Sequence, residues 1–291
     1  MSEKHIDEVS GVETTGHEWD GIKELNNPLP RWWLWTFYGC IAFAIGYTIA
    51  YPAWPLISSA TGGVLGYSSR ADLNETLVTA KAAQGDLLAQ VEARPLGEIL
   101  ADDNLARFAR AGGRSTFKVY CSQCHGSGAE GAVGYPNLND DEWIWGGTVD
   151  EIFTTISHGV RSTADTDTRF NEMPRFGADG LLEPTQITTV AKYVASLSGI
   201  EGGEATPEGQ QLFADNCAAC HGEAGLGLKE LGGPSLADPI WLYHPKGATL
   251  ADIESQVQKP RHGMMPAWSA KLGGATIKQL AVYVHGLGGG Q

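Results

Sequence analysis

Cysteine and methionine are scarce in this sequence, with five and four residues among 291. Four of the cysteines fall into two Cys-x-x-Cys-His motifs, at residues 121–125 and 217–221. Only Cys40 is left over, and it lies in an apolar run, where a free thiol behaves as a small hydrophobe. The sequence therefore excludes a framework of structural disulfides.

Positive charge is also in short supply. Lysine and arginine number 20 against 34 acidic residues, which gives a formal net charge of -14. Such a surface repels nucleic acid and favours a partner with a basic docking face. We therefore expect no nucleic-acid binding.

Charged residues are missing altogether from a long stretch near the N-terminus. The residues from Trp32 to Ala53 carry none, and this length suffices for a helix to cross a hydrocarbon core of about 30 Å. Aromatic residues at both ends are typical of the two membrane interfaces. A secretory signal is excluded, because some 30 mostly polar residues precede a run that is too long for one. We predict a retained, single-pass transmembrane helix at 32–54, after an N-terminal segment at 1–31.

The remainder contains an internal repeat. A glycine and a phenylalanine lie eight and four residues before each motif, and a Met-Pro pair follows it. The matching pairs are Gly113 and Gly209, Phe117 and Phe213, Trp143 and Trp241, Met173 and Met265, Tyr193 and Tyr283. The first copy carries an extra polar loop at 161–172, and the short flexible linker 199–206 joins the copies. We predict two domains at 108–198 and 204–287, and one or two short amphipathic helices in a connecting segment at 55–107.

Two cysteines at positions i and i+3 of one helical turn can both form thioethers to a single haem, and the adjacent histidine then faces the iron. Cys-x-x-Cys-His is for this reason an attachment signal for haem c. Zinc is a rival ligand of Cys-x-x-Cys, but zinc fingers need a second pair at a suitable spacing, and here the pairs are 96 residues apart. A thioredoxin-like motif would require a βαβ pattern, which neither copy shows. We expect two covalent haems, at Cys121 and Cys124 and at Cys217 and Cys220, with His125 and His221 as axial ligands.

The sixth iron ligand is expected from methionine, which raises the reduction potential in cytochromes c. Met173 and Met265 occupy equivalent Met-Pro positions, and proline stiffens the loop that presents the sulfur. Met264 is the alternative to Met265, but it does not precede proline. His158 and His262 are possible competitors just before the two loops. The sequence leaves open whether each methionine serves the haem of its own repeat.

A ligating histidine usually donates its second ring N–H to a carbonyl oxygen, which fixes the ring. The repeat resembles class I cytochrome c, and this resemblance implies a mainly α fold and assigns the acceptor carbonyls to Pro136 and Pro234. Trp143, Trp241, Tyr193 and Tyr283 are candidates for either haem contact or core packing.

The segment around the membrane helix carries a more specific resemblance. Residues 19–33 (WDGIKELNNPLPRWW) and 51–55 (YPAWP) resemble the dihaem subunit of cbb3-type cytochrome c oxidases. This resemblance covers nearly the whole chain. It implies a non-catalytic subunit that passes electrons from a soluble cytochrome c toward a monohaem subunit and the haem-copper catalytic subunit, where oxygen is reduced and protons are pumped.

The resemblance to other proteins with covalent haem c, which acquire it on the outer side of the membrane, implies a bacterial inner-membrane protein. Its N-terminus would be cytoplasmic and its haem domains periplasmic. Three alternatives remain: a free-standing electron shuttle, a dihaem peroxidase and a haem-based gas sensor. The last two need an open or displaceable sixth position, which two Met-Pro loops argue against.

Overall fold

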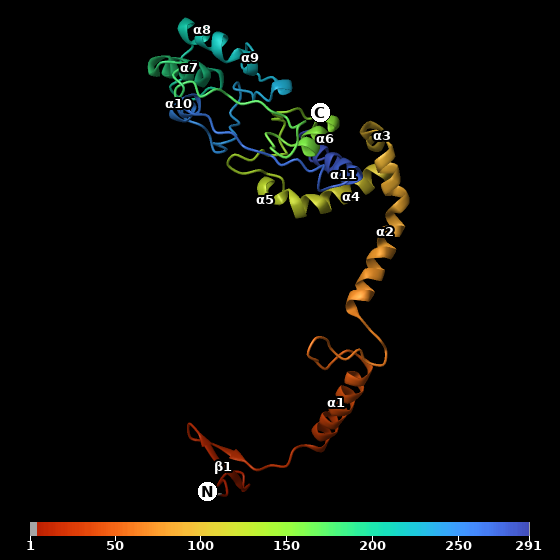
Figure 1. Cartoon of the computed structure of the whole chain (residues 1–291). Helices are drawn as coiled ribbons and strands as arrows, with labels where there is room; N and C mark the ends of the chain where they lie inside the picture. The colour runs from red at the N-terminus through yellow and green to blue at the C-terminus, as the bar shows by residue number, and fades with distance from the viewer. Residues whose placement is uncertain (1–4, 291) are drawn as a thin grey trace. The chain divides into compact units, whose positions relative to one another are not determined.

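In the computed structural model, which describes residues 5–290, the chain divides into two compact units, Met1–Ala83 and Gln84–Gln291. Helices dominate both units (Figure 1), which confirms the mainly α prediction. The first unit holds β1 (Thr14–Trp19), β2 (Ile22–Leu25), α1 (Arg31–Ala50) and most of α2 (Ser69–Ala93). The second contains α3 (Leu96–Ala101), α4 (Asp103–Tyr120), α5 (Ser122–His125), α6 (Val149–His158), α7 (Pro184–Leu197), α8 (Pro207–Asn216), α9 (Ala218–His221), a 3-10 turn η1 (Lys229–Leu231), α10 (Leu250–Gln258) and α11 (Gly274–His285).

Strands β1 and β2 form an antiparallel hairpin in the N-terminal segment. Its turn is Asp20-Gly21, and both residues have positive φ, 49° and 82°. Two consecutive residues with positive φ define the tight turn that matches strand twist, and Asp-Gly is a preferred sequence for it. This hairpin was not predicted from the sequence, although Asp-Gly was the available signal.

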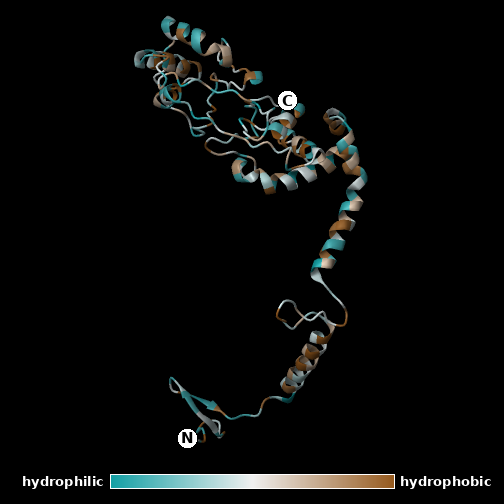
Figure 2. Ribbon diagram, in the orientation of Figure 1, coloured by the Kyte–Doolittle hydropathy of each residue, from teal (hydrophilic) through white to brown (hydrophobic). Residues whose placement is uncertain are grey.

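Helix α1 is the one helix among residues 5–290 that is long and apolar enough to cross a membrane. None of its residues is buried, and its 20 residues correspond to about 30 Å. Figure 2 shows hydrophobic residues along this helix. The helix ends at Ala50, four residues earlier than predicted, because Pro52 restricts the residue before it and offers no N–H.

The segment predicted to hold one or two short amphipathic helices is built differently. Helix α2 has 25 residues, and Val91 is its only buried residue. Pro95 does separate two helices, since it stands as the N-cap of the six-residue α3. The expectation of short helices is therefore wrong for α2, whose apolar residues do not form a single face.

Two hydrophobic cores occupy the second unit. The first surrounds Phe117 and contains residues of α3, α4, α6 and α11; the second surrounds Phe213 and contains residues of α7, α8 and α10. Helix α11 closes the second repeat in sequence, yet it packs on α4 and α6 of the first repeat. Helix α7 closes the first repeat and packs on α8 and α10 of the second. Each core therefore draws its helices from both repeats.

The two exchanged helix crossings have the same construction. Gly113 of α4 lies so close to α11 that a Cβ would meet the Gln279 carbonyl oxygen and come within 2.6 Å of the Tyr283 Cβ. Gly209 of α8 lies against α7 in the same way, because a Cβ there would come within 2.9 Å of the Tyr193 Cβ. The ring centroids of Phe117 and Tyr283 are 5.4 Å apart, as are those of Phe213 and Tyr193. The glycines that mark the repeat therefore permit close backbone approach at both crossings.

Replacing Gly113 by alanine should push α4 and α11 apart. We expect Gly113→Ala to lower the free energy of unfolding by about 1–3 kcal/mol, the usual cost of overpacking. Thermal unfolding of the full chain in detergent measures the change. Gly97→Ala is the matched control, because a Cβ at this exposed position in α3 meets nothing within 4 Å and should stabilise the helix by about 0.5–1 kcal/mol. Equal effects of the two substitutions would contradict the close crossing.

Candidate functional site

Each Cys-x-x-Cys-His motif lies in one helical turn at the end of a longer helix. Cys121 caps α4, with its backbone N–H bonded to the Phe117 carbonyl at 2.9 Å, and α5 follows at once. Cys217 caps α8 in the same way, 2.8 Å from the Phe213 carbonyl, and α9 follows. Both cysteines and the histidine of a motif are thus held on a single turn next to a buried phenylalanine.

The two motif histidines have their rings fixed by backbone carbonyls. The Nδ1 atom of His125 lies 3.0 Å from the Pro136 oxygen, and Nδ1 of His221 lies 2.9 Å from the Pro234 oxygen. Because a carbonyl can only accept, Nδ1 carries the proton and Nε2 keeps a free lone pair. Burial lowers the pKa of both histidines, and the carbonyl partners act in the opposite direction. Neutral imidazoles with free Nε2 atoms are the form that binds a metal.

The motif thiols have the opposite character from redox-active cysteines. Burial, with a smaller contribution from the neighbouring thiol, raises the pKa of Cys121 to about 11 and that of Cys217 to about 11. Reactive and metal-binding cysteines are instead found where the surroundings stabilise a thiolate. Cys121 and Cys217 therefore lack the surroundings of a reactive thiolate.

A cavity of about 610 Å³ connects the two motifs. Its lining is mostly apolar and includes both motif histidines, all four motif cysteines and the loops that carry Met173 and Met265. Trp143 and Trp241 also line it, whereas Tyr193 and Tyr283 belong to the helix crossings. The structure thus assigns the two tryptophans to the cavity and the two tyrosines to core packing, a choice that the sequence left open.

The two Met-Pro loops are exchanged between the cores. Met265, from the second repeat, packs against the first core, which also includes Cys121. Met173, from the first repeat, packs against the second core together with Cys217. The neighbouring Met264 is 60% exposed and packs against neither core. The hydrophobic core beside each motif is therefore contacted by the methionine of the other repeat.

Backbone hydrogen bonds hold the exchanged loops together. Val160 and Met265 form an antiparallel bridge, with both N–H···O distances at 2.9 Å. The Met173 N–H donates to Nε2 of His262 at 3.0 Å. This hydrogen bond occupies one of the two ring nitrogens through which His262 could bind iron. His158 lies 3.1 Å from Asp165 through Nδ1 and is not among the cavity residues. The two rival histidines therefore have other partners.

Arg161 was not singled out from the sequence, yet it joins the two repeats. Its Nε donates to the Gly263 carbonyl at 2.7 Å, and its Nη1 donates to the Asn171 carbonyl at 2.9 Å. Its φ of 52° is unusual for a residue with a side chain. Asn171 in turn donates to the Leu231 carbonyl of the second repeat at 2.7 Å. The extra loop at 161–172, which distinguishes the first copy in sequence, thus fastens the two copies to each other.

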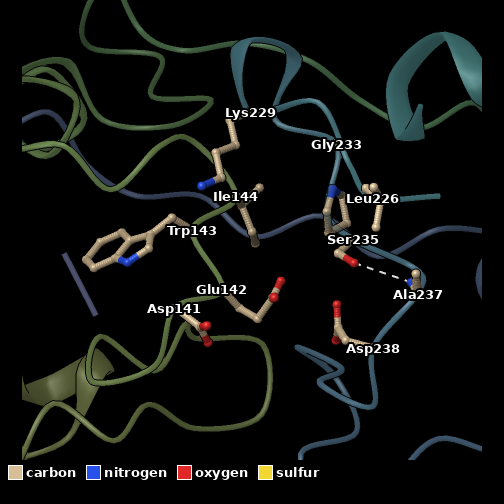
Figure 3. A pocket seen from close by; sticks show the side chains of 11 residues that line it. Asp141, Glu142, Trp143, Ile144, Leu226, Lys229, Gly233, Ser235, Ala237 and Asp238 are labelled. Atoms are coloured by element: carbon tan, nitrogen blue, oxygen red, sulfur yellow. Dashed lines mark hydrogen bonds between the residues drawn. The ribbon is translucent and has the colours of Figure 1, made fainter. Parts of the chain in front are cut away.

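A smaller, acidic pocket of about 290 Å³ lies beside the cavity (Figure 3). Glu142 and Asp238, one from each repeat, face the same space, and Lys229 is the cation at its wall. Burial raises the pKa of Glu142, and the charges of Asp238 and the neighbouring carboxylates raise it further. This is a concentration of negative charge where the two repeats meet.

The chemistry of these groups fits haem c. Each site offers two thiols on one turn, an oriented neutral imidazole and a thioether, all around a mostly apolar cavity. Histidine and methionine are the axial ligands of cytochromes c. Fold and sites together define a c-type cytochrome with two tandem cytochrome c domains.

Comparisons with known proteins specify the family. The model of the N-terminal domain of cytochrome oxidase-cbb3, FixP, matches residues 11–58, and that of cytochrome c oxidase, cbb3-type, subunit III matches residues 109–194 and 204–284. The chain belongs to the FixP/CcoP subunit family of cbb3-type cytochrome c oxidases.

Individual relatives match along nearly their whole length. The subunit FixP of Sinorhizobium medicae is 54% identical over 289 residues, covering 99% of this chain and 98% of the relative. FixPc of Rhizobium leguminosarum bv. viciae is 55% identical, with 100% of both chains covered. CcoP of Cereibacter sphaeroides is 53% identical, covering 96% of this chain and 95% of the relative.

Removing the Arg161 side chain should loosen the contact between the repeats. We expect Arg161→Ala to cost about 1.5–3 kcal/mol of stability, the range for a hydrogen bond to a charged group. Chemical unfolding of the full chain measures the loss. Arg175→Ala is the control, because Arg175 forms only an exposed i,i+4 pair with Asp179 and should change stability by less than about 0.5 kcal/mol. An Arg161 variant as stable as the control would show that the contact is dispensable.

Proposed function

We propose that this chain is the dihaem electron-transfer subunit of a cbb3-type oxidase. In this proposal it accepts electrons from a soluble cytochrome c and passes them to the monohaem and catalytic subunits. The observation that carries the proposal is the pair of equivalent ligand sets facing one cavity. Oxygen reduction and proton pumping belong to the catalytic subunit, and this chain is non-catalytic.

The protein's own residues account for an electron-transfer site. The cysteines of each motif would attach one haem c, and the Pro136 and Pro234 carbonyls hold His125 and His221 in the tautomer that presents Nε2. Such a haem supplies reversible one-electron chemistry at its iron. Met173 and Met265 would supply the remaining protein ligands to the two irons, and a site filled in this way would suit electron transfer rather than substrate binding.

We further propose that the axial methionines are exchanged. Met265 completes the site of His125, and Met173 completes the site of His221. The core contacts of the two methionines, the bridge between Val160 and Met265, and the exchange of α7 and α11 all support this pairing. For each methionine to serve its own repeat on this packing, α11 would have to leave α4 and α6, α7 would have to leave α8 and α10, and the two Met-Pro loops would have to exchange places.

A single-haem protein tests the pairing. In a Cys121→Ala/Cys124→Ala chain, only the haem at Cys217 and Cys220 is attached. Met173→His in this background should lower the potential of that haem, because imidazole replaces the thioether. Met265→His should leave its potential and absorption spectrum unchanged, and serves as the matched control. If a redox titration instead showed that Met265→His lowers this potential and Met173→His does not, the methionine would ligate the haem of its own repeat.

Purification of the chain tests the larger proposal. An affinity tag on this chain, mild detergent extraction and a reduced-minus-oxidised spectrum should reveal haem c together with haem b, copper and oxygen-consuming activity. The reason is that an oxidase subunit remains bound to its haem-copper partner. A chain that emerges alone with haem c only would instead support a free-standing electron carrier.

The proposed location follows from α1 and from where haem c is attached. We place residues 1–31 in the cytoplasm and the haem domains in the periplasm of a bacterial inner membrane, with α1 as a single-pass anchor. The acidic pocket beside the cavity suits a donor with a basic face. Protease digestion of intact spheroplasts would remove the haem domains in this orientation and spare them in the opposite one.

A further inference from the structure

Residues 51–67 fold into a hook at the end of α1. The chain doubles back where Pro55 pairs with Ala60, and a hydrogen bond of 2.6 Å from the Leu56 N–H to the Ser59 oxygen closes the tip. It then returns to the helix, with the N–H groups of Val64 and Leu65 bonded to the carbonyls of Ile49 and Ala50 at 2.9 and 3.1 Å. The hook is therefore part of the folded end of α1.

The hook exposes large apolar side chains. Ile57 at the tip is fully exposed and Val64 is 78% exposed. Trp54, Leu56 and Leu65 are each more than half exposed. Clusters of exposed apolar side chains mark surfaces that contact something other than water. No residue of either hydrophobic core belongs to this segment.

Charge is also missing from the hook. No acidic or basic residue, and no histidine, occurs between Arg31 and Arg70, so the uncharged stretch continues well beyond the end of α1. The helix needs only about 20 such residues to span the hydrocarbon core. The additional uncharged residues are the hook.

The backbone of the hook suits a poorly hydrated environment. Pro52 and Pro55 have no N–H, and the Thr61 hydroxyl accepts from the N–H groups of Ala53 and Trp54 at 3.3 and 3.1 Å. Irregular backbone is costly near lipid unless its polar groups are paired within the protein. Here much of that pairing is already made.

The depth of the hook follows from its attachment. Tyr51 stacks on Tyr47 of α1 and meets Tyr67 edge-on, with centroids 4.8 and 5.5 Å apart. Gly63 lies directly against the Ala50 carbonyl, where a side chain would not fit. The hook is thus held beside the C-terminal end of α1, and tyrosine and tryptophan are residues that favour a membrane interface.

We propose that the hook is a second membrane contact, which inserts Leu56 and Ile57 into the lipid interface of the leaflet on the haem side. Its apolar side chains would be buried about 5–10 Å into the boundary between headgroups and acyl chains, as those of interfacial apolar segments are. The occupant of this surface is lipid, because the apolar side chains continue directly from the membrane-spanning helix and the tip is the part most exposed. The proposal rests on α1 being the membrane anchor.

Fluorescence quenching in the assembled complex tests the hook. Cys40 of α1 is exposed, and the motif cysteines would be protected by their thioethers once haem is attached, so Cys40 is the one cysteine of this chain left for a thiol-reactive fluorophore, and the unlabelled background is a complex whose chain carries Cys40→Ser. Ile57→Cys and Leu65→Cys in a Cys40→Ser background place the fluorophore on the hook. Asn74→Cys in the same background, on the exposed face of α2, is the aqueous control. Lipid vesicles that contain brominated lipids, or soluble iodide, supply the quencher.

Lipid insertion predicts that both hook labels are quenched by bromines near the headgroup end of the chains and protected from iodide. The label on Cys40 should respond to bromines placed deeper, and the Asn74 label to iodide only. Hook labels that iodide quenches would overturn the proposal in favour of water. Hook labels that neither agent quenches would overturn it in favour of a covering subunit. Failure at Cys40 as well would mean that α1 itself is not in the bilayer.

Discussion

The second unit depends on the close crossing of two pairs of helices, α4 with α11 and α8 with α7. At each crossing a glycine lets the two backbones approach closely, and a phenylalanine from one helix packs on a tyrosine from the other. The two crossings are chemically equivalent, so helix chemistry alone allows either choice of partner. The connection at 199–206 favours one of them, because short connections join antiparallel neighbours and α7 and α8 are joined by so few residues. The salt bridge between Lys192 and Glu204 ties this connection to α7. Because α7 then occupies the crossing with α8, the equivalent crossing that remains for α11 is the one with α4.

Much of this could be predicted from the sequence, because the relevant chemistry is local. A Cys-x-x-Cys-His turn, an apolar helix and a repeated Met-Pro pair depend on residues that are neighbours in the chain. The partner of each repeated element could not be predicted, since Gly113 and Gly209 have equivalent surroundings in sequence. The boundaries 108–198 and 204–287 describe the repeats as sequence units, whereas the packing combines helices from both. The membership of the second core depends on the short connection between α7 and α8, and that of the first core on contacts between residues more than 100 apart, such as Gly113 and Gln279.

Other features escaped prediction for different physical reasons. Helix α2 mixes leucine and charge without a clear period, so its length gave no sequence signal. Arg161 occupies a backbone conformation that side chains rarely adopt, and it bonds to carbonyl oxygens, which exist at every residue and leave no pattern. The interlocking role of the loop at 161–172 arises only when the two Met-Pro loops lie side by side. A polar insertion in one copy of a repeat is nevertheless a useful indication that the two copies differ in their contacts.

The exchange of helices also bears on how such a chain can be synthesised. The motif at Cys121 leaves the ribosome well before the residues that complete its surroundings, because Met265 and α11 follow it by more than 140 residues. The second motif is in a different position, since α7 and Met173 precede it. The motif translated first is therefore the one whose surroundings are completed last. A chain cut before α11 would lose a wall of the earlier site and keep the helices around the later one, so the two sites are completed in the reverse of the order in which their motifs are translated.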